Sequence, residues 1–135
     1  MNSEKTKASR PSTTPVFLNY WLPPFIYAAF IFYLSSLPGT AFVSPFFSAD
    51  KVFHLGEYAV LGYLLARALG RYQVKKKKLF ITAAFICFAY GLSDELHQFF
   101  VPDRCTSLMD VIVDGIGSSL GIGMYLKLDF RTFLR

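Results

Sequence analysis

Ionisable side chains occur at three places within apolar stretches of the chain. In chain order they are His54 with Glu57, Glu95 with His97, and Asp110 with Asp114. Carboxylates can act as general acids or bases, and imidazole and carboxylate groups together can bind zinc. The candidate catalytic residues are therefore Glu95, Glu57 and His54, and the candidate metal ligands are His54 and His97.

The residues around Glu95 do not complete a known catalytic motif. His97 lies about 200° around a helix from Glu95, so these two side chains do not chelate one ion together. The sequence has no His-Glu-x-x-His zinc motif, no glycine-rich phosphate loop and no cofactor fingerprint, and Ser93 and Ser107 have no evident base. We therefore predict no cofactor, and the sequence leaves open whether the protein is an enzyme.

The composition excludes several classes of protein. Of the 135 residues, 53% are hydrophobic and 17% are charged, whereas soluble domains carry about a quarter charged residues. This number of charged side chains is too small to cover the surface of a soluble domain. The high hydrophobic content also excludes a disordered chain. Two cysteines are too few for a disulfide scaffold, and the net charge of +5 does not indicate nucleic-acid binding, because a basic face would need a soluble body. The composition is that of a membrane protein.

Four apolar stretches are long enough to cross a bilayer, which takes about 17 to 25 residues. They cover residues 20–37, 52–69, 79–101 and 108–128. The predicted fold class is all-α, an integral membrane bundle of four transmembrane helices. Residues 1–15 are predicted to form a disordered cytoplasmic tail, and residues 16–135 the membrane domain. An alternative is that the first stretch is a signal peptide cleaved near residues 41–49.

Charge is distributed unevenly between the two sides that four spans create. One side holds both termini and twelve of the fourteen Lys and Arg residues, including those at 75–78. The other side keeps seven of the nine acids and only Lys51 and Arg104. Since cations accumulate on the cytoplasmic side of a membrane, both termini are predicted to be cytoplasmic.

Three carboxylates lie at matching depth in these spans. Glu57 is six residues into the second span, Glu95 is six residues before the end of the third, and Asp114 is six residues into the fourth. At about 1.5 Å per residue, each lies roughly 9 Å below the outer boundary. Because ionisable groups are unfavourable in hydrocarbon, we predict that they share a polar pocket open to the outer face. The alternative is a buried hydrogen-bond network that holds the helices together.

Other residues of the outer half have structural interpretations. Asp50 is placed as a helix N-cap and Asp110 in a first helical turn, where a carboxylate meets the positive end of the helix dipole. Asp103 follows a proline and is predicted to lie in a tight turn. Gly117 and Gly121 have the small-xxx-small spacing of closely packed membrane helices.

Four motifs occur in order along residues 50–124. They are Asp50-Lys51-x-x-His54-x-x-x-Tyr58, Tyr90-Gly91-x-Ser93-Asp94-Glu95-x-His97-Gln98, Pro102-x-Arg104 and Asp110-x-x-x-Asp114-x-x-Gly117-x-x-x-Gly121. Together they resemble the VanZ-like family of small bacterial membrane proteins. The chain departs from the family pattern at Asp103, where glycine is frequent, and at Asp114, where asparagine is frequent.

The resemblance implies a multi-pass helical protein of the bacterial cytoplasmic (inner) membrane. The namesake of the family is associated with resistance to the lipoglycopeptide teicoplanin. Carried over position by position, the polar signature of the family falls on Asp50 and on the candidate substrate-binding residues, which are Lys51, His54, Tyr58, Glu95, Gln98, Arg104, Asp110 and Asp114.

Three functions are compatible with these observations. The first is a role in teicoplanin-type glycopeptide resistance or in the handling of envelope lipids, through binding of a lipid-linked wall precursor or a lipoglycopeptide at the outer leaflet. The second is an intramembrane hydrolase or transferase that acts on a lipid-linked substrate, and the third is a structural subunit of an envelope complex. The expected partners are the lipid bilayer and such a ligand, with no nucleic acid, and the oligomeric state is open.

Overall fold

The protein is a bundle of four long helices. The computed structural model describes residues 17–39, 49–104 and 106–133, and within these ranges it contains helices and turns but no strand. A short π-helix precedes the first α-helix. The elements are η1 (Phe17–Trp21), α1 (Leu22–Ser35), α2 (Ala49–Gly70), α3 (Lys76–Gln98) and α4 (Leu108–Phe133). The prediction of an all-α fold is confirmed.

Three of the helical segments are long and apolar enough to cross a membrane. They are Phe17–Ser35, Lys76–Gln98 and Leu108–Asp129. Helix α2 has the length of a span, with 22 residues, but His54, Glu57 and Arg67 interrupt its apolar character. The structure therefore establishes three helices with the properties of membrane spans, and a fourth span at α2 stays a prediction.

The third helix is displaced along the sequence from its predicted bounds of 79–101. Helix α3 begins at Lys76 and ends at Gln98. The prediction placed the start where the lysine run ends, but lysine is a good helix former and charged residues can form the first turn. At the other end the chain leaves the helix in a turn at Phe99 and Phe100, although these residues are apolar.

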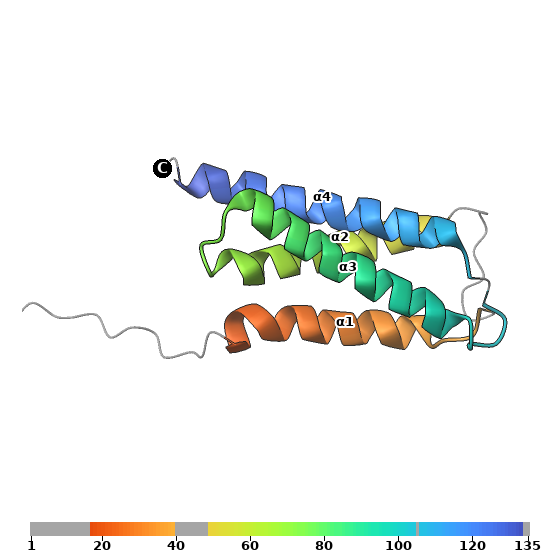
Figure 1. Cartoon of the computed structure of the whole chain (residues 1–135). Coiled ribbons are helices and arrows are strands. Elements are labelled where there is room, and N and C mark those ends of the chain that lie inside the picture. Colours follow the sequence, from red (N-terminus) through yellow and green to blue (C-terminus); the bar gives the residue numbers. More distant parts are fainter. Residues whose placement is uncertain (1–16, 40–48, 105, 134–135) are drawn as a thin grey trace, which may run out of the picture.

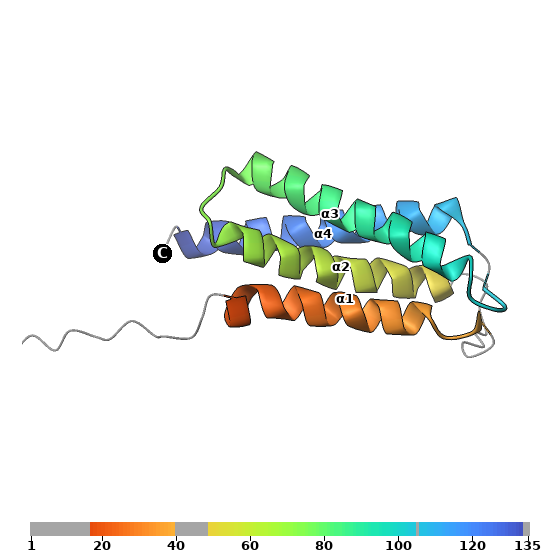
Figure 2. The same cartoon turned by 60° about the horizontal axis from the view of Figure 1, so that its bottom comes forward.

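The four helices alternate in direction along the bundle. One end of the bundle holds the start of α1, the turn between α2 and α3, and the end of α4. The other end holds the ends of α1 and α3 and the starts of α2 and α4 (Figures 1 and 2). The first end carries Arg67, Arg71 and the lysines at 75–78, and we call it the basic end. The second carries seven acids, Asp50, Glu57, Asp94, Glu95, Asp103, Asp110 and Asp114, and we call it the acidic end.

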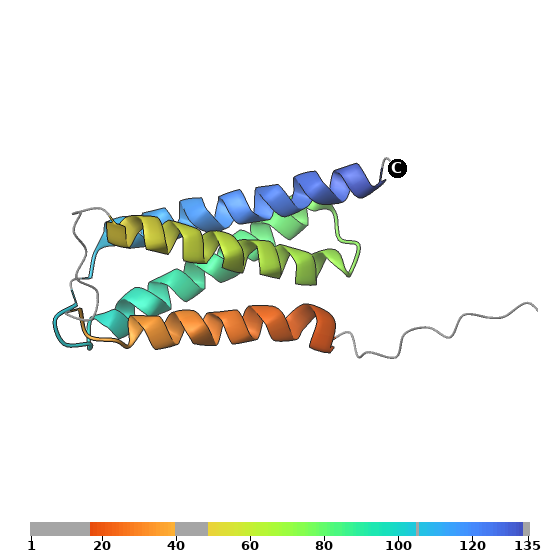
Figure 3. The same cartoon turned by 180° about the vertical axis from the view of Figure 1, so that it is seen from behind.

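Helices α2 and α4 form the tightest pair in the bundle, and the view from behind shows them side by side (Figure 3). Glycines permit this close approach. A Cβ atom at Gly117 would overlap the backbone carbonyl of Leu55, and one at Gly121 would overlap that of Ala59. The prediction that these two glycines pack against a neighbouring helix is confirmed.

Apolar residues fill the interior and also cover the outside. Ile31, Tyr58 and Ile122 are fully buried in the core. Large apolar side chains are also exposed, including Phe85 at 70% and Leu120 at 59%. Exposed apolar side chains on every helix are what lipid contact requires and what water disfavours.

Two sequence predictions fall outside the described residues. They are the disordered tail at residues 1–15 and, apart from Ala49, the signal-peptide cleavage near residues 41–49.

Candidate functional site at the acidic end

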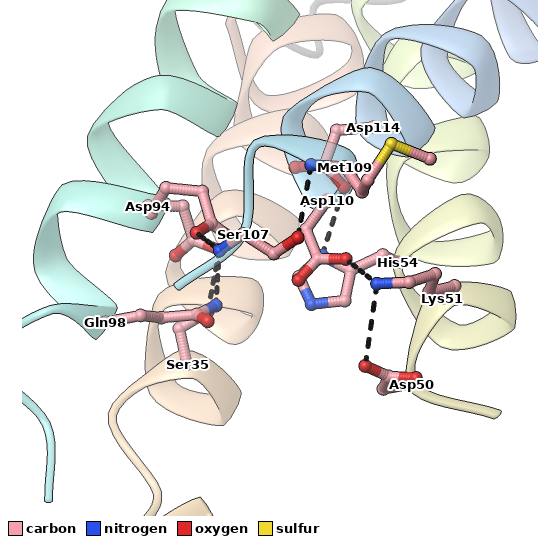
Figure 4. A network of polar contacts seen from close by, with 11 residues as sticks. Ser35, Asp50, Lys51, His54, Asp94, Gln98, Ser107, Met109, Asp110 and Asp114 are labelled. Atoms are coloured by element: carbon pink, nitrogen blue, oxygen red, sulfur yellow. Dashed lines mark hydrogen bonds and ion pairs between the residues drawn. The ribbon is translucent and has the colours of Figure 1, made fainter. Parts of the chain in front are cut away.

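A close pair of polar side chains joins α2 to α4 near the acidic end. His54 Nδ1 lies 3.1 Å from Asp114 Oδ1, and both residues are buried (Figure 4). Gly91 on α3 makes room for this carboxylate, because a Cβ there would come within 3.1 Å of Asp114 Oδ2. The sequence places His54 and Glu57 on one face of α2, but the structure pairs His54 with a residue of another helix.

A second group of polar side chains joins α1 to α3. Ser35 Oγ donates to Asp94 Oδ2 at 2.8 Å, and Gln98 Nε2 donates to the same oxygen at 3.2 Å. All three side chains are buried, and they lie together in Figure 4. Sequence reasoning missed the roles of Ser35 and Asp94. The available signal was the serine pair 35–36 at the end of the first apolar stretch.

Lys51 pairs with two aspartates just ahead of the predicted second span. Its Nζ donates to Asp110 Oδ1 at 2.6 Å and lies 3.9 Å from Asp50 Oδ2. The hydrogen bond to Asp110 is the main cause that raises the pKa of Lys51 above its ordinary value. Asp50 and Asp110 both occupy first helical turns. Asp50 was predicted as an N-cap, but α2 begins one residue earlier, at Ala49.

Glu95 contacts the start of α4 and turns away from Asp94. Its Oε2 accepts a hydrogen bond from the backbone N–H of Ser107 at 3.0 Å. The hydroxyl of Ser107 in turn accepts the N–H of Met109 at 3.2 Å, so Ser107 caps α4. One carboxylate oxygen of Glu95 thereby helps to position the first turn of α4.

Arg104 caps the end of α1. Its Nε donates to the carbonyl of Leu37 at 3.1 Å, and its Nη2 donates to that of Leu34 at 2.8 Å. Helix α1 ends nearby, at Ser35, so its last carbonyls have few backbone partners; that of Leu34 also accepts the N–H of Leu37 at 3.2 Å. Asp103, the preceding residue, has a φ of 59°, which explains why glycine is suited to this turn. The predicted tight turn at Asp103 is confirmed.

The capping contact predicts that Arg104→Ala destabilises the fold. The half-buried guanidinium makes two hydrogen bonds, so we expect the free energy of unfolding to fall by about 1 kcal/mol. Arg104→Lys should recover only part of this loss, because an ammonium group does not reproduce the fork of the guanidinium. The measurement is unfolding in detergent followed by circular dichroism. An Arg104→Ala protein as stable as the wild type would contradict the capping role.

The two histidines do not share a site. His97 Nε2 lies 2.9 Å from Ser36 Oγ, and its ring stacks on Phe32 with 4.4 Å between centroids. His54 instead faces Asp114. Among the described residues, no three His, Cys, Asp or Glu side chains are grouped so that they could hold a metal ion.

Five of the predicted site residues line two separate hollows of the surface, and the others, among them Asp110 and Asp114, line neither. A cavity of about 200 Å³ lies between α1 and α2, and a groove of about 510 Å³ lies between α3 and α4. The cavity is lined by Leu34, Ser35, Asp50, Phe53, His54, Glu57, Gln98 and Arg104. Glu95 lines the groove instead. The carboxylates placed at matching depth therefore do not all face one pocket.

Four buried oxygen atoms of the acidic end have no hydrogen-bond partner within the described chain. They belong to Tyr58, Asp94, Glu95 and Asp114. Burying an unpaired polar atom costs about 1–3 kcal/mol, so such atoms point to a proton, a water molecule or a ligand that completes them. Unpaired buried oxygens are a feature that neither composition nor spacing reveals.

Three membrane-length helices, an apolar exterior and a polar acidic end define this protein as a multi-pass helical membrane protein. Comparison with protein families agrees with this class. A family model described as VanZ/LLP1 matches residues 3–131, and the chain belongs to the VanZ/LLP1 family. No curated protein and no solved structure matches the chain.

Proposed function

We propose that this protein crosses the bacterial cytoplasmic membrane four times, with both termini in the cytoplasm. The cavity between α1 and α2 then opens on the outer side, where it binds the polar headgroup of a lipid-linked wall precursor or a lipoglycopeptide. This binding would serve teicoplanin-type resistance or the handling of envelope lipids. The proposed role in resistance comes from the family resemblance, whereas the proposed class of ligand comes from the residues that line the cavity.

The lining of the cavity is the observation that carries the proposal. It combines two carboxylates, Asp50 and Glu57, with the cation of Arg104 and the imidazole of His54. Such a set can both donate and accept hydrogen bonds, as recognition of a polar headgroup requires. Its volume of about 200 Å³ is below the roughly 300 Å³ at which drug-sized sites begin. The cavity therefore suits one polar group of a larger molecule.

The surroundings of α2 support a fourth span. The imidazole of His54 is buried against Asp114, and the guanidinium of Arg67 lies over the ring of Tyr20 at 5.1 Å. Polar groups that face neighbouring helices avoid most of the cost of contact with hydrocarbon. The separation of acidic and basic ends supports the orientation, because the basic end belongs on the cytoplasmic side.

The proposal predicts that Glu57→Gln reduces ligand binding. Loss of the carboxylate charge should cost about 1.5–3 kcal/mol, which is roughly tenfold or more in affinity. We would express the protein in a teicoplanin-susceptible bacterium and measure the minimal inhibitory concentration. The wild type should raise this concentration, and Glu57→Gln should lose most of the increase at an equal membrane level.

The matched control is Asp129→Asn, which removes an exposed acid from the opposite end of the bundle. It should leave resistance unchanged. Resistance that survives Glu57→Gln, or that falls equally in both variants, would contradict a role for this cavity. Among the described residues, no observation specifically favours the hydrolase, transferase or structural-subunit alternatives.

A further inference from the structure

The groove between α3 and α4 is separate from the cavity of the proposed function. Apolar side chains form most of its walls, with Leu92 and Leu96 on α3 and Leu108 and Val111 on α4. It shares no lining residue with the cavity between α1 and α2. Leu96 is 64% exposed and Leu108 is 81% exposed, so the rims of the groove are open to a surrounding bilayer.

One ionisable side chain lies in this apolar groove. Glu95 is only 8% exposed. Its Oε2 accepts the backbone N–H of Ser107, but its Oε1 is buried and has no partner within the described chain. Hydrocarbon chains of bulk lipid could fill the groove, but they would offer Oε1 of Glu95 no hydrogen-bond donor. A ligand that fills the groove and also completes this oxygen therefore carries a hydrogen-bond donor as well as an apolar chain.

Charge decides which donor is favoured. The nearest ionisable groups on the adjoining helix are Asp110 and Asp114, and the acidic end as a whole holds seven acids against Lys51 and Arg104. Lys51 donates to Asp110 and His54 lies against Asp114, whereas Oε1 of Glu95 has no hydrogen-bond partner within the described chain. An anionic head would be repelled here, and a cationic head would complete the carboxylate.

We propose that the groove between α3 and α4 binds an amphiphile with a primary ammonium head and a long hydrocarbon chain. The ammonium group donates to Oε1 of Glu95, and the chain lies along Leu92 and Leu96 and enters from the bilayer. This binding site goes beyond the proposed function and does not depend on the cavity between α1 and α2.

Photolabelling tests this site directly. The full-length protein is placed in phosphatidylcholine nanodiscs with a hexadecylamine that carries a diazirine in its chain, and labelled peptides are mapped by mass spectrometry. Labelling should concentrate in residues 92–96 and 108–111. Unlabelled hexadecylamine should compete with the probe, and hexadecyl sulfate should not.

Two variants separate the head contact from the chain contact. Glu95→Gln keeps an oxygen that can accept the N–H of Ser107 but removes the charge, and it should reduce groove labelling about tenfold, the loss that about 1.4 kcal/mol produces. Leu96→Trp adds a large ring at the apolar wall of the groove and leaves Glu95 unchanged, and it should block labelling even if Glu95→Gln fails to fold. Glu57→Gln and Leu120→Trp are the matched controls, one in the other cavity and one on an exposed apolar face, and both should label as the wild type does.

Three results would overturn this site. The first is labelling spread over exposed apolar residues such as Phe85 and Leu120. The second is equal competition by the amine and the sulfate, which would show that the head is not recognised. The third is groove labelling that neither Glu95→Gln nor Leu96→Trp reduces, which would show that neither the carboxylate nor the apolar wall holds the probe. Because Glu57→Gln reports on the other cavity, failure of this site and failure of the proposed function give different results.

Discussion

Gly121→Leu is expected to lower the free energy of unfolding by about 3 kcal/mol or more. Overpacking a tight interface typically costs about 1–3 kcal/mol, and the upper end applies here because the obstacle is backbone. The first added carbon would meet the carbonyl of Ala59 and approach the backbone nitrogen of Tyr63. No side-chain rotation relieves this contact, so α4 would have to move away from α2.

The matched control is Gly123→Leu, two residues along the same helix. A Cβ at Gly123 meets nothing within 4 Å, and leucine is favoured over glycine in a helix by up to about 1 kcal/mol. This variant should therefore be as stable as the wild type or slightly more stable. Both are measured by unfolding in detergent, followed by circular dichroism. Equal stability of the two variants would show that the close approach of α2 and α4 is not needed.

The same displacement would reach the polar site. Gly117 and Gly121 follow Asp114 on α4, and Leu55 and Ala59 follow His54 on α2. The contacts that set the separation of the two backbones thus lie within a few residues of the 3.1 Å contact between His54 and Asp114. The glycines between α2 and α4 are therefore needed to keep His54 and Asp114 at hydrogen-bonding distance.

The features that could be predicted from sequence are those that depend on one helix at a time. An apolar stretch defines a helix, two glycines four residues apart define a close-packing face, and the proline before Asp103 defines a turn. The clustering of acids near one end could also be predicted, because position along a helix follows from counting residues.

The features that could not be predicted depend on how each helix is rotated against its neighbours. Asp94 and Glu95 are adjacent and so lie about 100° apart around α3. Because of this difference, Asp94 accepts a hydrogen bond from Ser35 of α1, whereas Glu95 accepts one from Ser107, which precedes α4. The sequence shows how deep each polar side chain lies along its helix, but only packing decides which neighbour that side chain meets.

The role of Arg104 was also hidden in the sequence. An arginine beside an acidic cluster suggests an anion clamp, since its fork matches carboxylate and phosphate groups. The structure shows two of its nitrogens on backbone carbonyls of Leu34 and Leu37. The last carbonyls of any helix are available as hydrogen-bond acceptors, but the sequence does not show which long side chain reaches them.

The second large effect is expected at Asp114. Asp114→Ala leaves the buried imidazole of His54 without its acceptor, and breaking a buried charged pair from one side costs about 3–5 kcal/mol. Asp114 is 1% exposed and His54 is 8% exposed, so water would not replace the lost partner. Asp114→Asn should cost much less, because the amide oxygen can still accept a hydrogen bond from the imidazole.

A double-mutant cycle isolates the contribution of this pair. We expect His54→Ala and Asp114→Ala to be less than additive, with a coupling of about 0.5–3 kcal/mol in the free energy of unfolding. Asp50→Ala is the control, because Asp50 is exposed and should change stability by no more than about 0.5 kcal/mol. Additive losses would contradict a direct interaction between His54 and Asp114.

The size of the coupling also distinguishes two uses of the acidic end. A strong coupling means that His54 and Asp114 hold α2 against α4, and the residues available to a ligand are then Glu57 in the cavity and Glu95 in the groove. A weak coupling means that the two side chains are retained at a cost in stability, as residues that meet a ligand often are. His54 already lines the cavity between α1 and α2, so in that case ligand binding should stabilise the wild type more than His54→Ala.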